Sequence, residues 1–458
     1  MINRSLWASN IGVASGTLAS RLTGLLRVVI FAAVIGQTAL ADAFDVGNNA
    51  PNVVYELLLG GTLTAALVPL FVQHHQRNDR EASAAVFGAS LLGAAAITVA
   101  AIIAAPLIFR VYALSPTGDH DAFRRVGIAL TRVFLIQIFF YALNALVTAS
   151  LNARDRFLAA AWAPVASNLV AAVALVAIWR AHTGGVVDLA DADVGSTIFW
   201  WFALGPTLGI GMMALIVLGV GIRVGAVPKP RFQFSHPSVQ RLRALSGWAV
   251  GYIAANQVAL IVVKNLAEPG SGKLDAYAKA MIIFQLPHGL LAVTIATTAT
   301  PLLARAVAED NSLAFAQRFA SGARATVVLT LPCSLVLFAF AEPIVRLLFG
   351  WGAFSDDAVR LTSEALAGLS LGLAGFSLYL FVLRGFYSHG DTRTPFIINV
   401  FENALNIVLA FLLADRYGVH GLGIAFALAY LVSALVAVAV LRRRHGTPGL
   451  VGLLRART

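Results

Sequence analysis

The sequence predicts an all-α membrane protein whose chain crosses the bilayer about twelve times, in two six-helix bundles. Hydrophobic residues make up 59% of the 458 positions, charged residues only 12%, and the mean hydropathy is +0.81. A soluble domain has roughly 45 to 50% apolar residues. The apolar runs reach the roughly 20 residues that span a hydrocarbon core as a helix, and they lack the alternation of a membrane β-barrel. Polar segments separate runs near residues 6–36, 45–73, 84–109, 123–149, 158–180, 196–222, 240–266, 275–304, 320–345, 358–386, 394–414 and 420–441.

The first apolar run is expected to remain as a helix rather than to be removed as a signal peptide. It carries Asn10, Arg21 and Arg27, is longer than a signal h-region, and shows no evident cleavage site.

The distribution of charge predicts the orientation in the membrane. About 20 of the 33 Lys and Arg residues fall on the side of the two termini and the even-numbered loops, against about 8 on the other side. Both termini are therefore expected in the cytoplasm, with residues 182–195 outside. The net charge of +11 requires no nucleic-acid partner, because basic segments such as RVGAVPKPRF and LRRRHG suit the anionic lipids of an inner leaflet.

The two halves of the chain resemble each other. Pro69 in ALVPLF aligns with Pro301 in TATPLL, APLIFRVY aligns with AEPIVRLLF, and NARDRF aligns with SHGDTRTPF, each about 235 residues apart. This order predicts two bundles related by a pseudo-two-fold axis along the membrane normal, a pattern typical of transporters that rock one half against the other. The expected organisation is an N-terminal lobe at 1–225, a cytoplasmic linker at 226–237, a C-terminal lobe at 238–445 and a basic cytoplasmic tail at 446–458.

Two arginines in the first apolar run are the first candidate site. A charge at membrane depth costs roughly 2.5 to 3.5 kcal/mol, so Arg21 and Arg27 indicate a wet cavity or an anionic ligand. Six residues separate them, so on a straight helix they point roughly 120° apart, and both face one cavity only if the helix bends near Gly24. Snorkelling or a structural ion pair is the alternative for either one.

Polar residues in the second and seventh to eighth runs are further candidates. Asp45, Asn49, Asn52 and Glu56 have the i, i+4, i+7, i+11 spacing of one helix face, which predicts a stripe facing the cavity or a polar packing seam. The loop between the seventh and eighth runs is flanked by two lysines, Lys264 and Lys279. These lysines lie either at the cavity or merely at the membrane interface.

The eleventh run holds a candidate ion site. Glu402 and Asn406 are i, i+4 neighbours, and Asn399 lies one turn earlier, so three oxygen-bearing side chains share one face of an apolar span. A buried carboxylate among amides can hold Na⁺ or carry a proton. An ion pair between Glu402 and a basic residue elsewhere, such as Arg132, explains the pattern equally well.

Several segments resemble the MurJ (MviN) family of lipid II flippases, of the multidrug/oligosaccharidyl-lipid/polysaccharide exporter superfamily. The resemblance covers nearly the whole chain, and its most specific motifs are S-R-x-x-G-x-x-R at Ser20 to Arg27, D-A-F from Asp42, P-N ending at Asn52 and the D-x-x-T-P corner from Asp391. It implies export of undecaprenyl-pyrophosphate-linked disaccharide-pentapeptide across the bacterial cytoplasmic membrane, for peptidoglycan synthesis and cell shape, with cell-wall synthesis proteins as candidate partners. Arg21 and Arg27 match the cavity arginines thought to meet the pyrophosphate, and Asp42 joins the candidate substrate-binding residues.

The sequence also departs from the usual family pattern. Tyr55 stands where many members have a further cavity arginine, and Ala280, beside Lys279, stands in the place of another. The segment YELLLGG is more similar to the actinobacterial branch of the family. Many members have fourteen helices, the last two forming a lipid groove, whereas twelve runs and a short basic tail are found here. Some members bind Na⁺ through helices 7, 11 and 12, and Glu402 and Asn406 match the helix 11 positions, with Glu402 in place of an amide.

Other functions fit the sequence less well. A flippase for another polyprenyl-linked glycan would share the mechanism, whereas a cation-coupled multidrug exporter would favour acidic and aromatic binding walls over arginines. An enzyme would need an acid/base cluster in a sizeable loop, and the sequence shows no zinc spacing, Gly-rich phosphate loop or nucleophile elbow. The expectation is therefore a transporter without a cofactor, driven by the membrane potential or by a gradient of an ion such as Na⁺ or H⁺.

Overall fold

The fold is helical and divides into two compact units. In a computed structural model, the described residues (4–58, 62–77, 79–182 and 185–447) form helices and connecting loops, with no strand among them. One unit comprises Met1–Ala254 with Gly270–Gly272 and Trp351–Phe354, and the other comprises Ala255–Pro269, Lys273–Gly350 and Ser355–Thr458. The lobe and linker boundaries expected from the sequence stay predictions, and residues 448–458 of the expected tail lie outside the described residues.

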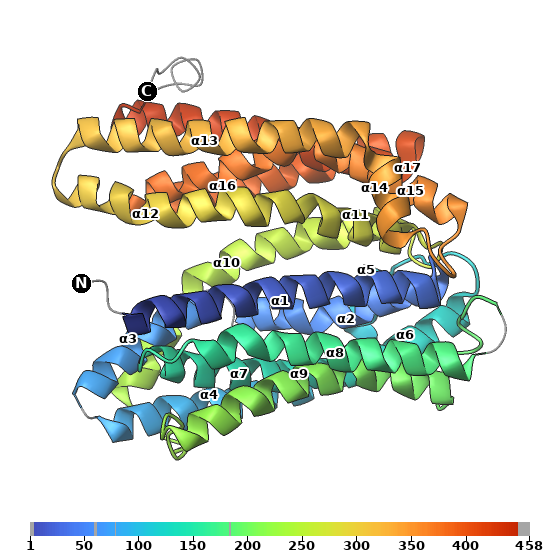
Figure 1. Cartoon of the computed structure of the whole chain (residues 1–458), viewed down its shortest axis with the longest axis horizontal. Coiled ribbons are helices and arrows are strands. Elements are labelled where there is room, and N and C mark those ends of the chain that lie inside the picture. Colours follow the sequence, from blue (N-terminus) through green and yellow to red (C-terminus); the bar gives the residue numbers. More distant parts are fainter. Residues whose placement is uncertain (1–3, 59–61, 78, 183–184, 448–458) are drawn as a thin grey trace. The chain divides into compact units, whose positions relative to one another are not determined.

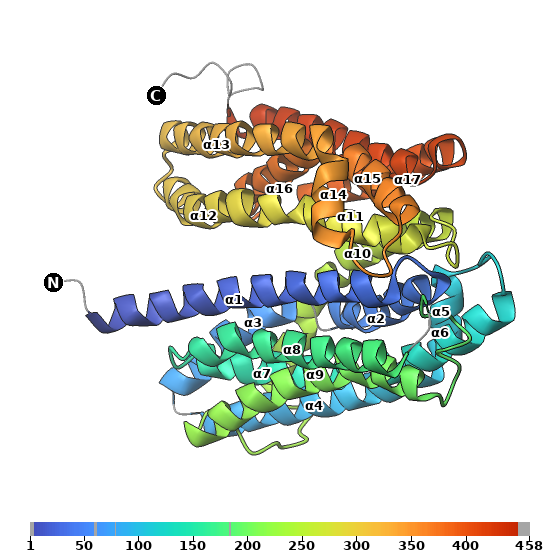
Figure 2. The same cartoon turned by 45° about the vertical axis from the view of Figure 1, so that its right-hand side comes forward.

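The first unit is built around three neighbouring helices, α1, α8 and α9. In both views α1 lies beside α8, and α8 beside α9 (Figures 1 and 2). The elements of this unit are α1 (Arg4–Ile35), α2 (Ala39–Leu58), α3 (Thr62–Gln76), α4 (Arg80–Ile103), α5 (Ala105–Tyr112), α6 (His120–Leu135), α7 (Gln137–Asn152), α8 (Leu158–Ala181), α9 (Thr197–Arg223) and the first part of α10 (Pro237–Leu266).

In the second unit, α13 packs against α12 and α16, and α16 packs against α17 (Figure 1). A π-helical turn follows Pro287, and it interrupts what is otherwise a continuous helical path from residue 273 to residue 308. Besides the end of α10, the elements are α11 (Lys273–Pro287), η1 (His288–Ala292), α12 (Val293–Ala308), α13 (Ser312–Ala339), α14 (Ala341–Phe349), α15 (Asp356–Ser370), α16 (Leu373–Ser388) and α17 (Arg393–His445).

Many of these helices are long and apolar enough to cross a membrane. Among the described residues eight helical segments meet that condition, or nine if the bent pair α15 and α16, which turns by 47°, is one span. The 53 residues of α17 are broken at Gly418, where φ is 55° and ψ is −135°. This break leaves two pieces of roughly 25 residues, each longer than the roughly 20 needed to span hydrocarbon. The expected twelve crossings and the pseudo-two-fold axis stay predictions.

Side chains at the helix boundaries and in the core explain these elements. Asp79, Ser196 and Ser355 accept hydrogen bonds from backbone N–H groups in the first turns of α4, α9 and α15, which satisfies donors that a helix leaves unpaired. The first unit packs around buried aromatic residues such as Phe134 and Phe202, and the second unit has its own core.

Candidate functional site

A cavity of about 300 Å³ lies inside the first unit, among α1, α2, α7, α8 and α9. About half of its wall is polar, with amides, hydroxyls and one guanidinium, and none of the lining residues is acidic. The lining residues are Ser20, Arg27, Asn48, Asn52, Gln137, Tyr141, Pro164, Ser167, Asn168, Ala171, Pro206, Ile210 and Met213.

Arg27 provides the positive charge of this cavity. Its Nε is buried and receives no hydrogen-bond partner from the described residues. A buried N–H donor of a charged group without an acceptor is costly, because it has left water without a compensating hydrogen bond. The cavity therefore has the chemistry of an anion site, with a cation at one side and amide N–H donors around it.

Arg21 is placed differently from Arg27. Its side chain is exposed, and it does not line the cavity of the first unit. The helix α1 is continuous through both residues, so the angular separation of about 120° expected for a straight helix is kept. The structure thus brings only Arg27 into this cavity, and a role for Arg21 in substrate binding stays a prediction.

The polar stripe of α2 reaches the cavity through a different pair of residues than expected. Asn52 lines the cavity together with Asn48, one turn earlier, whereas the half-buried Asp45 and Asn49 do not. The side chain of Glu56 lies outside the described residues. The i, i+4 spacing of Asn48 and Asn52 was the signal in the sequence that could have found this pair.

Asp42 of the D-A-F motif holds a loop. It is fully buried near the start of α2, and its Oδ2 accepts hydrogen bonds from the backbone N–H groups of Gly270 and Gly272, both at 2.8 Å. Both glycines have positive φ, 96° and 82°, a conformation that other residues rarely adopt. Asp42 does not line the cavity of the first unit.

The two candidate lysines are buried in the second unit. On α11, the ammonium of Lys279 pairs with the carboxylate of Asp275, one turn earlier, and the exposed fractions of the two side chains are only 3% and 7%. Lys264, on α10, is 5% exposed. The sequence DAYAK contains the i, i+4 pair, so Lys279 could have been paired with Asp275 from its spacing alone.

Glu402 lies between amide residues of α17 in the second unit. On α17, Asn399 and Asn403 each donate a hydrogen bond through Nδ2 to Oδ1 of Asn256 on α10, at 3.0 and 2.9 Å. Three buried acceptors receive no hydrogen bond from the described residues: Asn399 Oδ1, Glu402 Oε2 and Asn406 Oδ1. Glu402 itself is 1% exposed. The three oxygen-bearing residues expected on one face of this helix are thus buried, and Asn256 and Asn403 are members that sequence reasoning missed.

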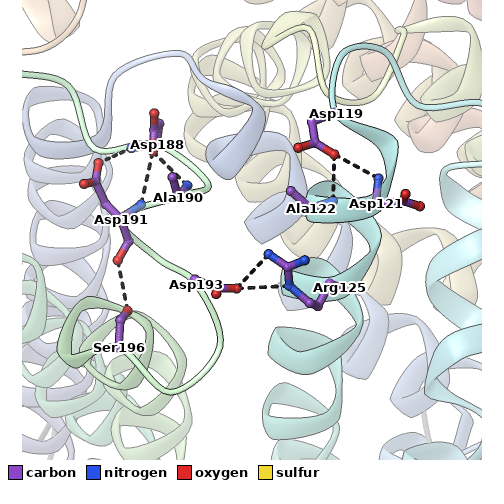
Figure 3. A network of polar contacts seen from close by, with 9 residues as sticks. All are labelled: Asp119, Asp121, Ala122, Arg125, Asp188, Ala190, Asp191, Asp193 and Ser196. Atoms are coloured by element: carbon purple, nitrogen blue, oxygen red, sulfur yellow. Dashed lines mark hydrogen bonds and ion pairs between the residues drawn. The ribbon is translucent and has the colours of Figure 1, made fainter.

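An acidic loop in the first unit, between α8 and α9, is ordered by its own side chains (Figure 3). Asp188 accepts hydrogen bonds from the backbone N–H groups of Ala190 and Asp191, and Asp193 pairs with Arg125 of α6 at 3.0 Å. A backbone hydrogen bond from Val194, and then the hydrogen bond from Arg125, lower the pKa of Asp193 below its ordinary value. The carboxylates of this loop therefore serve its folding.

The fold is that of a multi-pass helical membrane protein. Among solved structures, a lipid II flippase MurJ in an inward closed conformation matches with a TM-score of 0.79 at 20% identity, covering 94% of this chain and 87% of that one. An inward-facing multidrug resistance MATE family transporter of the MOP superfamily matches with a TM-score of 0.74 at 16% identity, covering 94% of each chain.

Sequence comparison gives the family. The family model described as lipid II flippase MurJ matches residues 31–455. A probable lipid II flippase MurJ of Rhizobium meliloti (strain 1021) is 30% identical over 433 residues, covering 94% of this chain and 79% of the relative. A lipid II flippase MurJ of Burkholderia cenocepacia is 27% identical over 446 residues, covering 96% and 84%. The chain belongs to the MurJ family of lipid II flippases, which are transporters rather than enzymes.

Proposed function

We propose that the protein moves lipid II, the undecaprenyl-pyrophosphate-linked peptidoglycan precursor, from the inner to the outer leaflet of the bacterial cytoplasmic membrane by alternating access. Family membership supports the substrate, and the Arg27 cavity is the observation that supports the mechanism. A pyrophosphate with its sugar-peptide headgroup cannot cross hydrocarbon unaided, whereas the polyprenyl tail can stay in lipid. A cationic polar cavity at membrane depth lowers the barrier for the charged part alone.

In this proposal Arg27 binds the pyrophosphate. Its planar guanidinium can donate two parallel hydrogen bonds to phosphate oxygens, and the amides of Asn48 and Asn52 supply further donors around it. A volume of about 300 Å³ is at the lower end for drug-sized ligands, so the cavity suits the pyrophosphate and not the whole glycopeptide head.

The other substrate-binding candidates stay predictions, and two of them have structural partners that favour a scaffold role. Asp42 holds the glycine loop, and Lys279 pairs with Asp275. The remaining candidates are Arg21, Asp45, Asn49, Glu56 and Lys264.

Coupling to an ion gradient is proposed at Glu402. The unpaired oxygens of Asn399, Glu402 and Asn406 support a hard monovalent cation such as Na⁺, and the carboxylate can instead take a proton. Either ion would change the charge of a buried site, and each elementary charge moved through the membrane is worth about 2.3 kcal/mol per 100 mV. An inside-negative potential also acts on the substrate itself, and it favours outward movement of an anion.

The proposed topology follows the charge distribution. Both termini lie in the cytoplasm, with lobes at 1–225 and 238–445 joined by a cytoplasmic linker. Basic segments at the linker and tail support contact with anionic inner-leaflet lipids. Cell-wall synthesis proteins are the proposed partners, because lipid II is made and used by such proteins.

Replacement in cells tests this function. In bacteria depleted of their own lipid II flippase, expression of the protein should restore growth and the appearance of lipid II on the outer face of the cytoplasmic membrane. Membrane-inserted protein that restores neither would contradict the proposal. If the protein exports another polyprenyl-linked glycan and not lipid II, it is a flippase for that glycan instead.

A further inference from the structure

Asn168 of α8 is joined to the turn of α1 that precedes Arg27. Its Nδ2 donates hydrogen bonds to the backbone oxygen of Ser20 at 3.1 Å and to Oγ1 of Thr23 at 3.2 Å. The same Asn168 side chain lines the cavity beside Arg27. A polar link between two helices thus lies at the depth of the cavity.

The face of α1 that meets α8 is made of small residues four apart: Gly12, Gly16, Ser20 and Gly24. A Cβ added at Gly16 would lie 2.6 Å from Trp162, and one added at Gly24 would lie 3.4 Å from Nδ2 of Asn168. Small residues in this spacing let two membrane helices approach closely. At a point outside the cavity, Nε1 of Trp162 donates a second hydrogen bond across the same interface, to the backbone oxygen of Gly12 at 3.0 Å.

This face determines which arginine enters the cavity. At about 100° per residue, the positions from Gly12 to Gly24 sweep about 120° of the helix surface, and Arg27 falls near the middle of that arc. Arg21 lies about 120° away from Arg27. The rotation of α1 against α8 therefore decides whether the Arg27 guanidinium reaches the cavity.

We propose that Asn168 is a positioning residue for lipid II, because it fixes the rotation and height of α1 so that Arg27 points into the cavity. This inference rests on the proposed function, in which Arg27 binds the pyrophosphate. Asn168 acts through Arg27, and a supporting residue of this kind keeps a binding group within a fraction of an ångström of its productive position.

Lipid II binding by the purified full-length protein in nanodiscs tests the proposal. Asn168→Leu keeps the approximate shape of the side chain and removes the donor, so we expect about three- to tenfold weaker binding, the effect of losing one net hydrogen bond. Trp162→Phe is the matched control, because it removes a hydrogen bond from the same helix pair outside the cavity. Its affinity for lipid II should be that of the unaltered protein, even where its thermal stability falls as much as that of Asn168→Leu.

A double variant separates positioning from direct contact. If Asn168 acts through Arg27, Arg27→Ala with Asn168→Leu should bind lipid II no more weakly than Arg27→Ala alone. Losses that multiply in the double variant would mean that Asn168 touches the lipid itself, and this would overturn the proposal. An equal loss of affinity in Trp162→Phe would overturn it as well, because the effect would then be general helix packing.

Thr23→Val is the variant to measure if Asn168→Leu does not accumulate in the membrane. It removes one of the two acceptors of Asn168 and should weaken binding about twofold, again only when Arg27 is present; an unchanged affinity would overturn the proposal. Failure of the proposed function is distinguishable, because Arg27→Ala would then bind lipid II like the unaltered protein. If Arg27→Ala loses binding while Asn168→Leu keeps it, only the positioning role fails.

Discussion

Lys279 forms an ion pair with Asp275 one turn earlier on α11, and both side chains are almost completely buried. A charge that is neutralised in this way has less to offer an anionic substrate. The pair therefore argues against Lys279 as a replacement for the cavity arginine that the family usually has near this position.

Breaking the pair tests its structural role. Lys279→Met should destabilise the protein by about 3 to 5 kcal/mol, because it removes the ammonium that pairs with the buried Asp275 carboxylate. Lys279→Met with Asp275→Leu should recover much of that loss. Thermal unfolding of purified protein measures both. A stable Lys279→Met variant that no longer binds lipid II would instead assign Lys279 to the substrate.

Glu402 gives a prediction about coupling. Glu402→Gln keeps the shape of the side chain and removes its charge, so transport should depend less on Na⁺ or on pH, with a smaller effect on folding. Asn403→Leu is the control, because Asn403 donates to Asn256 and to the Asn399 carbonyl and should affect stability instead. Transport in vesicles with imposed ion gradients measures the dependence, and an unchanged dependence in Glu402→Gln would remove the coupling role.

Asp391, at the corner before α17, gives a prediction about pH. Burial favours the neutral carboxyl, but hydrogen bonds from Thr394 and the charge of Arg444 outweigh it and lower the pKa of Asp391 below its ordinary value. A carboxyl with a lowered pKa stabilises the folded state above its unfolded pKa and loses that contribution as the pH falls through its folded pKa. Asp391→Ala should therefore unfold at a lower temperature than the unaltered protein at pH 7, and the gap should narrow as the pH falls below the ordinary pKa of an aspartate, about 3.9. A gap that stays constant across this range would contradict the assignment.

Cysteine labelling tests the topology. In a Cys333→Ser background, which removes the single native cysteine, Val194→Cys should react with a membrane-impermeant maleimide added to intact cells. Lys229→Cys should react only after the membrane is opened, because the linker is predicted in the cytoplasm. The reverse pattern would overturn the orientation and with it the direction of transport.

Composition and motif spacing predicted the helical membrane fold and the family, because long apolar runs leave few other structures in a bilayer. They did not predict which polar residues share a cavity. Arg27 and Arg21 look equivalent in the sequence, and the difference between them depends on the face of α1 that α8 covers. The small residues from Gly12 to Gly24 carried that information, but the polar residues of α7 and α8 that complete the cavity come from distant parts of the chain. The hydrogen bonds of Asn168 to α1 and the place of Tyr141 in the cavity wall required the packed structure.

Lipid II binding by Arg27→Ala measures whether Arg27 holds the pyrophosphate. Lipid II affinity should fall by at least tenfold while the amount of protein in the membrane stays normal, because removing a charge from a membrane span eases insertion. Arg27→Lys should recover only part of the affinity, since it keeps the charge and loses the planar fork that holds two phosphate oxygens. An Arg27→Ala protein at normal abundance that binds and flips lipid II like the unaltered protein would show that Arg27 does not hold the pyrophosphate.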